Sequence, residues 1–267
     1  AKIIKEINPS IFVITLHHNF DRKFYLDSFS SIIDKMLINR VLDYNQKLAA
    51  SNSNMNLMFT KKDMYDIENL YGRIANDRKQ IFGFYEPITT SIAESSFRSS
   101  KMRLIITGNL SVKKGYIGVI NFIDEIFKKL DRYKFSLLIA GKAPVKELIA
   151  ICGRYENINI FANPESMQPL LHNADVYVNP CSLGSGIKIR NFDGLREGLP
   201  VACNIGNSYG FEHYSEKAFG TFDSVDTFLN VLKKLSYNKE EIYEEYISKN
   251  SLNVGVEKMK LLVSKSV

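Results

Sequence analysis

The sequence lacks the features that mark several large classes of protein. Its longest apolar runs, such as Ile11 to Ile14, are far shorter than the roughly 18–20 residues that a membrane-spanning helix needs. No secretory signal is recognisable near the start, because the polar residues His17 and His18 follow the apolar stretch at once. These absences argue against an integral membrane protein and against a secreted one.

Cysteine is scarce. The three cysteines, Cys152, Cys181 and Cys203, form no Cys-x-x-Cys pair, and they combine with the four histidines in no zinc-binding spacing. A reducing compartment is the natural interpretation. We therefore expect a cytoplasmic protein, with a peripheral position at the inner face of the membrane as the alternative.

The charge is mildly positive and dispersed. Lys and Arg number 35 and Asp and Glu number 29, a net charge of +6 without any long basic run. Solubility alone explains such a balance, and an anionic ligand or an acidic membrane surface would also suit it. Nucleic acid is not an expected partner, because no basic helix or aromatic-interleaved basic motif occurs. With 267 residues, 45% of them apolar, the chain can form one large or two small packed domains.

Short β-branched runs alternate with amphipathic stretches almost throughout. Strands are predicted at 11–16, 57–59, 81–85, 103–107, 135–140, 158–161, 175–179 and 201–204. Helices are predicted at 21–50, 60–71, 116–130 and 189–196, in a short segment ending at His172, and from about Ser224 onward. The Ser- and Thr-rich residues 86–102 indicate a linker. This alternation predicts an α/β fold with parallel sheets covered on both faces.

In such sheets, ligands bind beyond the carboxyl ends of the strands. The loops there are mostly glycine-containing, and two carry lysine: 108–115, 141–144, 162–166, 180–186 and 205–210. The most informative is 180–186 with the helix after it, where Gly184 and Gly186 flank Ser185. Glycines and a helix start suit an anion, Lys188 and Arg190 add charge, and Asp193 could reach a sugar hydroxyl. On composition alone, a tight turn with solvated charges explains this segment equally well.

The ordered motifs of the chain resemble one family. GSGIKIRNFDGLREGLPV (184–201) resembles the donor-site signature of retaining GT-B glycosyltransferases, the group that includes glycosyltransferase family four. TGNLSVKKGYIGVINFIDEIFKKL (107–130) and LLHNADVYVNP (170–180) resemble strands and a helix of its donor domain. LHHN (16–19) and NLMFTKKDMYDIENLYG (56–72) resemble its acceptor domain less closely.

The resemblance implies two Rossmann-like parallel-sheet domains that face a cleft. Residues 1–98 would be a partial acceptor-side domain that lacks its early part, 99–240 the nucleotide-sugar donor domain, and 241–267 a helical segment. The implied ligands of the donor diphosphate are Gly108, Asn109, Lys114, Gly184, Ser185, Gly186, Ile187 and Lys188. Asp193 takes the place of the glutamate that binds the ribose, and the base is expected near Ala162–Glu165.

Two implied positions depart from the family pattern. Asn109 stands where the family usually has an arginine, and Ser185 stands where it has the first glutamate of a pair. Lys188 and Arg190 could supply compensating charge. His18 matches a histidine that lies near the reacting sugar and orients or polarises the reacting groups. For His18, a hydrogen-bonded structural role is the alternative; His172 and His213 are interpreted as structural.

The implied activity is transfer of a sugar, with retention, from a nucleotide-diphosphate sugar to a glycan, lipid or other acceptor, in bacterial surface polysaccharide or glycoconjugate synthesis. The nucleotide sugar is the substrate, no cofactor is implied, and the donor loops contain no Asp-x-Asp metal motif. Asn109, Ser185 and the short first domain leave open a non-catalytic partner subunit. A nucleotide-sugar epimerase of the same fold would need further acid–base residues. An uncovered apolar face with Phe29, Ile33, Met36 and Leu37 predicts self-association, or contact with a partner or membrane surface, through residues 1–98.

Overall fold

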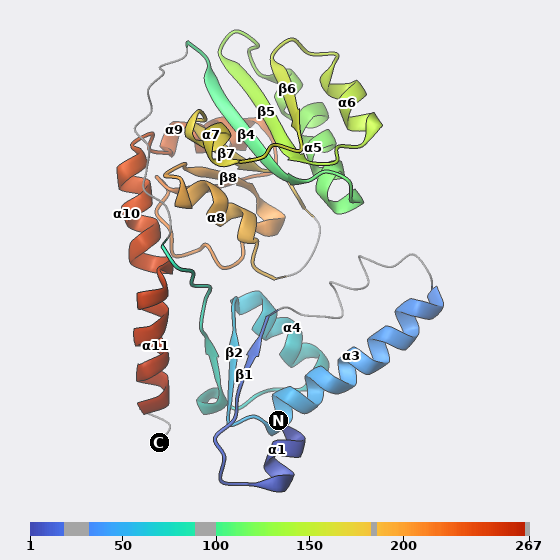
Figure 1. Cartoon of the computed structure of the whole chain (residues 1–267), viewed down its shortest axis with the longest axis vertical. Helices are drawn as coiled ribbons and strands as arrows, with labels where there is room; N and C mark the ends of the chain where they lie inside the picture. The colour runs from blue at the N-terminus through green and yellow to red at the C-terminus, as the bar shows by residue number, and fades with distance from the viewer. Residues whose placement is uncertain (19–31, 89–99, 183–185, 265–267) are drawn as a thin grey trace. The chain divides into compact units, whose positions relative to one another are not determined.

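Two parallel sheets organise the part of the chain that the structure describes, which covers residues 1–18, 32–88, 100–182 and 186–264. In this computed structural model, the strand orders are β1-β2-β3 and β6-β5-β4-β7-β8-β9 (Figure 1). The predicted α/β fold with parallel sheets is confirmed. The first of two units holds Ala1–Tyr85, Gly184–Ile187 and Gly255–Val267, and the second holds Glu86–Leu183 and Lys188–Val254.

The first unit contains the small sheet. Its strands β1 (Ile14–His17), β2 (Met55–Met58) and β3 (Lys79–Ile81) are accompanied by α1 (Lys2–Ile7), α3 (Ile32–Asn52), α4 (Lys61–Tyr71) and the 3-10 turn η1 (Asn76–Arg78). The predicted start and stop of α4 are confirmed, since the Thr60 side chain accepts a hydrogen bond from Asp63 N and Gly72 ends the helix with φ +98.

Helix α11 (Leu252–Ser264) completes the core of the first unit. Leu262 packs with Leu57 and Phe82 in one buried cluster. Gly255 allows a close approach, because a Cβ at this position would lie 2.5 Å from Cγ of Tyr85. The segment predicted to be helical at 241–267 thus contains two helices, α10 (Lys239–Asn250) and α11, and the first unit takes up α11 from Gly255 on.

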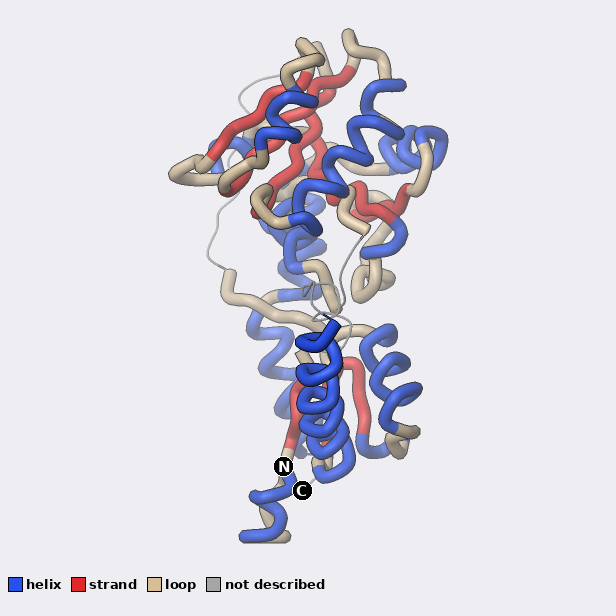
Figure 2. Tube along the Cα trace, turned by 90° about the vertical axis from the view of Figure 1, so that its right-hand side faces the viewer, coloured by secondary structure: helices blue, strands red, loops and turns tan. Residues whose placement is uncertain are grey.

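The second unit contains the larger sheet. Its strands are β4 (Met102–Asn109), β5 (Phe135–Lys142), β6 (Ile158–Ala162), β7 (Val176–Asn179), β8 (Val201–Asn204) and β9 (Phe219–Phe222). Helices lie on both sides of this sheet (Figure 2). They are α5 (Lys113–Glu125), α6 (Lys146–Cys152), α7 (Gln168–His172), α8 (Ile189–Arg196), α9 (Val225–Lys234) and α10, with 3-10 turns η2 (Phe127–Lys129) and η3 (Ile205–Asn207).

The order of the strands reverses at β4. The chain first builds outward from β4 through β5 to β6, and it then returns to place β7 on the other side of β4. Leu104 and Ile106 of β4, Leu137 and Ile139 of β5 and Val176 of β7 are buried in one large cluster that α5 and α9 also join. In a doubly wound sheet, the reversal point marks where ligands bind. A ligand is therefore expected at the carboxyl ends of β4 and β7.

The structure differs from the sequence predictions at several elements: α1 was not predicted, and the helix predicted at 116–130 consists of α5 and the 3-10 turn η2. Strand β9 was not predicted, because FGTF is only four residues long and follows a loop. The third strand lies at Lys79–Ile81 rather than 81–85, since Gly83 has φ +92 and cannot continue an extended strand. The helix predicted at 21–50 is described from Ile32, and residues 21–31 lie outside the described part. Within the described ranges, no helix is long and apolar enough to cross a membrane.

Candidate functional site

The carboxyl end of β4 carries the first predicted site residues. Gly108 pairs with Gly141 of β5, and Asn109 pairs with Lys142. Gly108 has φ +153, and a Cβ at this position would lie 2.6 Å from Cζ of Arg190. The guanidinium of Arg190 therefore rests against the backbone of Gly108, and only glycine leaves room for it.

Beyond Gly108, the chain turns into the start of α5. Oδ1 of Asn109 accepts hydrogen bonds from N and Oγ of Ser111, at 3.1 and 2.7 Å, which closes the loop. No described side chain caps α5, which begins at Lys113, and its first turn has no acidic residue. Backbone N–H groups and the positive end of the helix dipole are therefore presented at this edge. The backbone of Lys114 lies in the same turn, and its side chain lies outside the described part.

The second glycine-containing loop leads into α8. Gly184 and Ser185 lie outside the described residues. Gly186 has φ +71, Ile187 is buried, and the half-buried Lys188 is the N-cap residue of α8. Because Arg190 follows in the first turn, both predicted accessory cations stand at the start of one helix.

Helix α8 is held close to the sheet by small and amide side chains. A Cβ at Gly194 would lie 2.6 Å from Cβ of Tyr177, so the helix sits tightly on β7. Nδ2 of Asn179 donates a 2.7 Å hydrogen bond to Oδ1 of the fully buried Asn191. These contacts fix the rotation of α8 and with it the direction of its charged side chains.

Asp193 faces a mostly enclosed environment. Its Oδ1 lies 2.6 Å from Nη2 of Arg196, one turn further along α8. Burial raises the pKa of Asp193 to about 6, the charge of Glu86 adds to the rise, and the cations Arg196 and Arg190 oppose it. An ionised Asp193 can accept hydrogen bonds from two hydroxyl groups, as a ribose offers.

Arg196 joins Asp193 to a second carboxylate. Nη1 of Arg196 lies 3.0 Å from Oε2 of Glu86, whose other oxygen accepts a hydrogen bond from the hydroxyl of Tyr246. Glu86 is itself fixed by its backbone, because its N–H donates to Asn250 O at 3.0 Å and its carbonyl accepts from Leu252 N at 2.9 Å.

A pocket of about 340 Å³ opens beside Asp193. It is within the size range of small-molecule sites, roughly 300–1,000 Å³. Its lining comes from the end of β4, from α7 and from α8: Thr107, Met167, Gln168, Leu171, Asp193, Arg196 and Glu197. The Thr107 hydroxyl is fixed at 2.8 Å from the hydroxyl of the buried Tyr177. Apolar and polar groups together suit a nucleoside.

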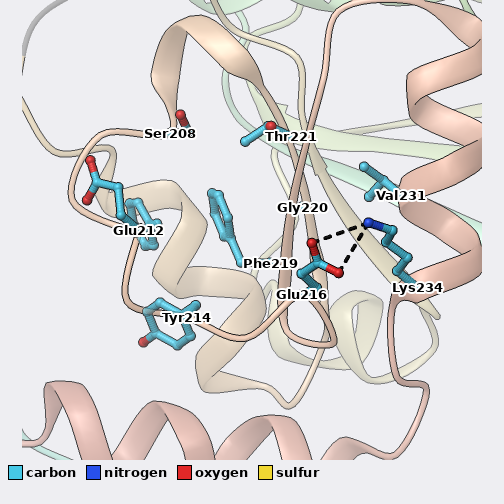
Figure 3. Close-up of a pocket in the computed structure, with 10 residues that line it drawn as sticks. Ser208, Glu212, Tyr214, Glu216, Phe219, Gly220, Thr221, Val231 and Lys234 are labelled. Carbon is cyan, nitrogen blue, oxygen red and sulfur yellow. Dashed lines mark hydrogen bonds and ion pairs between the residues drawn. The ribbon is translucent and has the colours of Figure 1, made fainter.

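A second pocket, beside β9 and α9, has the wrong charge for a diphosphate (Figure 3). It encloses about 310 Å³. Among the described residues that line it, Lys234 is the single cation, and it pairs with Glu216 at 3.2 Å. Glu212 adds a second carboxylate to the lining. A dianionic ligand would therefore be repelled there.

His18 belongs to the first unit. Its ring is exposed and meets the ring of Phe59 edge-on, with centroids 5.2 Å apart. His17 points to the other side: it is buried, and its Nε2 lies 2.9 Å from Oδ1 of Asn56. Of the two neighbours, His18 is the one whose ring solvent and ligands can reach.

The described residues contain no group of three or more His, Cys, Asp or Glu side chains that could hold a metal ion. The start of α5 and the guanidinium of Arg190 place positive charge at the end of β4, and Lys188 lies at the start of α8. These groups can neutralise a diphosphate directly.

These sheets and strand ends define the class of the protein, which has the GT-B fold. HepE of Anabaena, solved with UDP, matches with a TM-score of 0.70 at 10% identity, over 98% of this chain and 74% of HepE. The lipopolysaccharide outer core galactosyltransferase WaaB matches with a TM-score of 0.67 at 11% identity, over 100% and 79%. TarM of S. aureus matches with a TM-score of 0.64 at 13% identity, over 93% and 50%. At these identities, the similarity establishes the fold.

The family comparison concerns mainly the second unit. Residues 101–219 match the family model of the glycosyl transferases, group 1. The resemblance seen in the sequence is thereby confirmed. The chain spans about half the length of the TarM structure that it matches. No curated protein sequence shows significant similarity to the whole chain.

Sequence reasoning missed several residues around the pocket. Arg196 and Asp193 are three residues apart on one helix, a spacing that could have indicated their ion pair. His172, interpreted as structural, has Nε2 at 2.8 Å from Oε2 of Glu197. Glu86, which was not among the predicted site residues, forms an ion pair with Arg196, from which 110 positions separate it. No local pattern reports such a contact.

Proposed function

We propose that the chain provides the donor site of a retaining glycosyltransferase, which moves a sugar from a nucleotide-diphosphate sugar to a glycan, lipid or other acceptor. A role in bacterial surface polysaccharide or glycoconjugate synthesis is part of this proposal. The family match supports the chemistry. The main support for the site is the contact of the Arg190 guanidinium with Gly108, next to the uncapped start of α5.

The donor diphosphate would lie between the two helix starts. The backbone around Gly108 and Asn109, the start of α5 with Lys114, and the loop Gly184–Lys188 would surround it. Asn109 cannot provide the charge of an arginine, because its side chain is neutral and holds Ser111. Arg190 reaches the same place from α8 and would supply that charge. When the bond from the sugar to the diphosphate breaks, these groups would stabilise the departing negative charge without a metal.

The nucleoside would enter the pocket beside Asp193. An ionised Asp193 would accept hydrogen bonds from the ribose hydroxyls, and Thr107 and Gln168 would contribute polar contacts. The base is proposed to lie near Ala162–Glu165. HepE has been solved with UDP and glucose, and the pneumococcal transferase GtfA with UDP and GlcNAc. UDP is therefore the first nucleotide to test here.

The acceptor side would be formed by residues 1–98, most of which belong to the first unit. His18 would lie near the reacting sugar and orient or polarise the reacting groups, for which its exposed ring is suited. The same unit is proposed to mediate self-association or membrane contact. Ile33 of the predicted apolar face is 70% exposed, as is Ile3 of α1. The side chains of Phe29, Met36 and Leu37 lie outside the described part.

Calorimetry with UDP in the presence of a chelator tests the donor site. We expect binding without added divalent metal, and strict dependence on magnesium or manganese would contradict the proposal. A thermal-shift panel of other nucleoside diphosphates and nucleotide sugars would identify the base, because a ligand of the folded state raises the melting temperature.

One alternative has a specific observation in its favour. Asn109 stands where the family usually has an arginine, and its side chain only accepts hydrogen bonds from Ser111. A glycosyltransferase-like subunit that binds nucleotide without turnover is therefore the second candidate. Release of nucleoside diphosphate from a nucleotide sugar, measured with and without candidate acceptors, separates the two. Turnover supports the enzyme, and binding without turnover supports the subunit.

A further inference from the structure

A basic pocket lies at the opposite end of the large sheet from the candidate donor site. It encloses about 380 Å³ next to the amino ends of β4, β5 and β6. The lining residues are Lys101, Phe127, Lys128, Leu130, Arg132, Tyr133, Arg154, Tyr155, Glu156 and Asn157. Because strands of a parallel sheet all run the same way, the whole length of β4 separates this pocket from Gly108.

The charge of this pocket is strongly positive. Of the described residues that line it, four are cationic and only Glu156 is anionic. Outside the lining, Asp124 lies 3.8 Å from the pocket residue Lys128, whereas Asp131 lies 3.5 Å from Lys134 and accepts a hydrogen bond from the backbone of Tyr133. A cluster of cations confined to one pocket repels itself, and a bound anion would relieve that repulsion.

One cation in the pocket is held in a fixed geometry. Arg132 stacks over the ring of Tyr133, with Cζ 4.9 Å from the ring centroid, and its Nη2 donates a 2.7 Å hydrogen bond to the Tyr133 hydroxyl. The guanidinium has further N–H groups besides the one that donates to Tyr133. Arg154 adds a second guanidinium to the same lining. Planar N–H pairs of this kind match the oxygens of a phosphate.

The floor of the pocket is apolar. Phe127 is 2% exposed and Leu130 is 9% exposed, and both belong to the large core cluster. Both side chains are almost fully covered by that cluster, so the floor gives the pocket a rigid base. The charged and polar side chains around it provide the surface that a ligand would contact.

We propose that this pocket binds the phosphate group of a phosphate ester, either a soluble one or the headgroup of an anionic lipid. A phosphate carries up to about two negative charges, and the four cations, less Glu156 and Asp124, leave a net charge of +2 to balance it. The pocket is far from the candidate donor diphosphate site, so the proposal is independent of the proposed function.

Titration calorimetry with glycerol phosphate tests the proposal on the full chain. We expect Arg132→Gln combined with Arg154→Gln to weaken binding about tenfold or more. Added salt should weaken binding by the parent chain. Arg40→Gln combined with Arg73→Gln is the matched control, because it removes two exposed arginines of the first unit and should leave this binding unchanged. Circular dichroism checks that each variant is folded.

Co-sedimentation with phosphatidylglycerol vesicles, against phosphatidylcholine vesicles, distinguishes the two sources. Loss of vesicle binding in the double variant would assign the pocket to a lipid headgroup. Binding of glycerol phosphate without any vesicle binding would assign it to a soluble ester. The proposal is overturned if the parent chain binds neither probe, if the Arg132→Gln and Arg154→Gln variant binds as the parent does, or if the Arg40→Gln and Arg73→Gln control also loses the binding.

Discussion

Arg196 and Asp193 lie 2.6 Å apart on one face of α8, and the same guanidinium lies 3.0 Å from Glu86. One cation therefore serves two carboxylates. Since burial works against the ionised form of Asp193, Arg196 is the group that keeps this side chain charged at neutral pH. The carboxylate proposed to bind ribose thus depends on a residue that need not touch the ligand.

Arg196→Gln should destabilise the second unit by about 1–3 kcal/mol, because two part-buried carboxylates lose their cation. Urea unfolding measures the change, and Arg154→Gln, which removes an exposed arginine of the same unit, is the control. Glu86→Gln should lower the free energy of unfolding less when it is added to Arg196→Gln than when it is made in the parent chain. Fully additive effects of the two changes would show that the ion pair contributes nothing.

Asp193 should make stability depend on pH in a defined window. Its pKa is about 6 in the folded chain against an ordinary value of 3.8, so folding favours its protonated form. Its contribution is present below about pH 4, falls as the pH rises, and is lost above about pH 6. The stability of Asp193→Asn relative to the parent should therefore increase between these limits and then level off. A constant difference across this window would rule out the raised pKa.

Asp193→Ala should weaken binding of both UDP and uridine by about 10- to 100-fold, because a hydrogen bond to a charged group contributes roughly 1.5–3 kcal/mol. Titration calorimetry measures both ligands. Asp226→Ala, at an exposed position in α9, is the control and should bind as the parent does. If Asp193→Ala also binds as the parent does, the ribose assignment is wrong.

Lys114→Ala should weaken UDP binding by about tenfold while leaving uridine binding nearly unchanged, because an ammonium acts on phosphate charge. The neighbouring Lys113→Ala removes the same charge from the same turn of α5 and should have a smaller effect. The same calorimetric comparison applies. Equal losses for UDP and uridine would indicate a structural role for Lys114.

Gly108→Ala should displace Arg190, because the new Cβ would lie 2.6 Å from its guanidinium and φ is +153. We expect a loss of UDP affinity similar to that of Arg190→Gln and a loss of stability of about 1–3 kcal/mol. Gly153→Ala is the control, since its nearest atom would be 3.5 Å away. Unchanged UDP affinity in Gly108→Ala would show that Arg190 does not contribute to phosphate binding.

Local patterns in the sequence predict the elements that local physics determines. Helix α8 spans Ile189–Arg196 as expected, and α4 begins after Thr60 and ends at Gly72, because caps and periodicity act over a few residues. Strand β9 escaped prediction, since its four residues depend on pairing with β8, whose partner positions lie 18 residues earlier, as in Val201 and Phe219. Register of this kind is decided by the fold as a whole.

The residues of the candidate site likewise fall into those that the sequence reveals and those that it does not. The glycine loops and the cations Lys188 and Arg190 could be found because they stand together in the sequence. The contact of Arg190 with Gly108 and the ion pair of Arg196 with Glu86 could not be found from the sequence. These contacts join segments that only the sheet brings together, and no spacing along the chain encodes them.

Strands β4 and β5 approach so closely that a Cβ at Gly141 would lie 1.9 Å from the carbonyl oxygen of Gly108. Substitution at Gly141 would therefore be rejected on steric grounds alone, whether or not a nucleotide ever binds nearby. In a mutational scan of this chain, position 141 should be as intolerant as a residue in contact with substrate. Intolerance at the edge of this sheet consequently has two separate origins, crowding and chemistry, and only assays that resolve folding from binding will tell them apart.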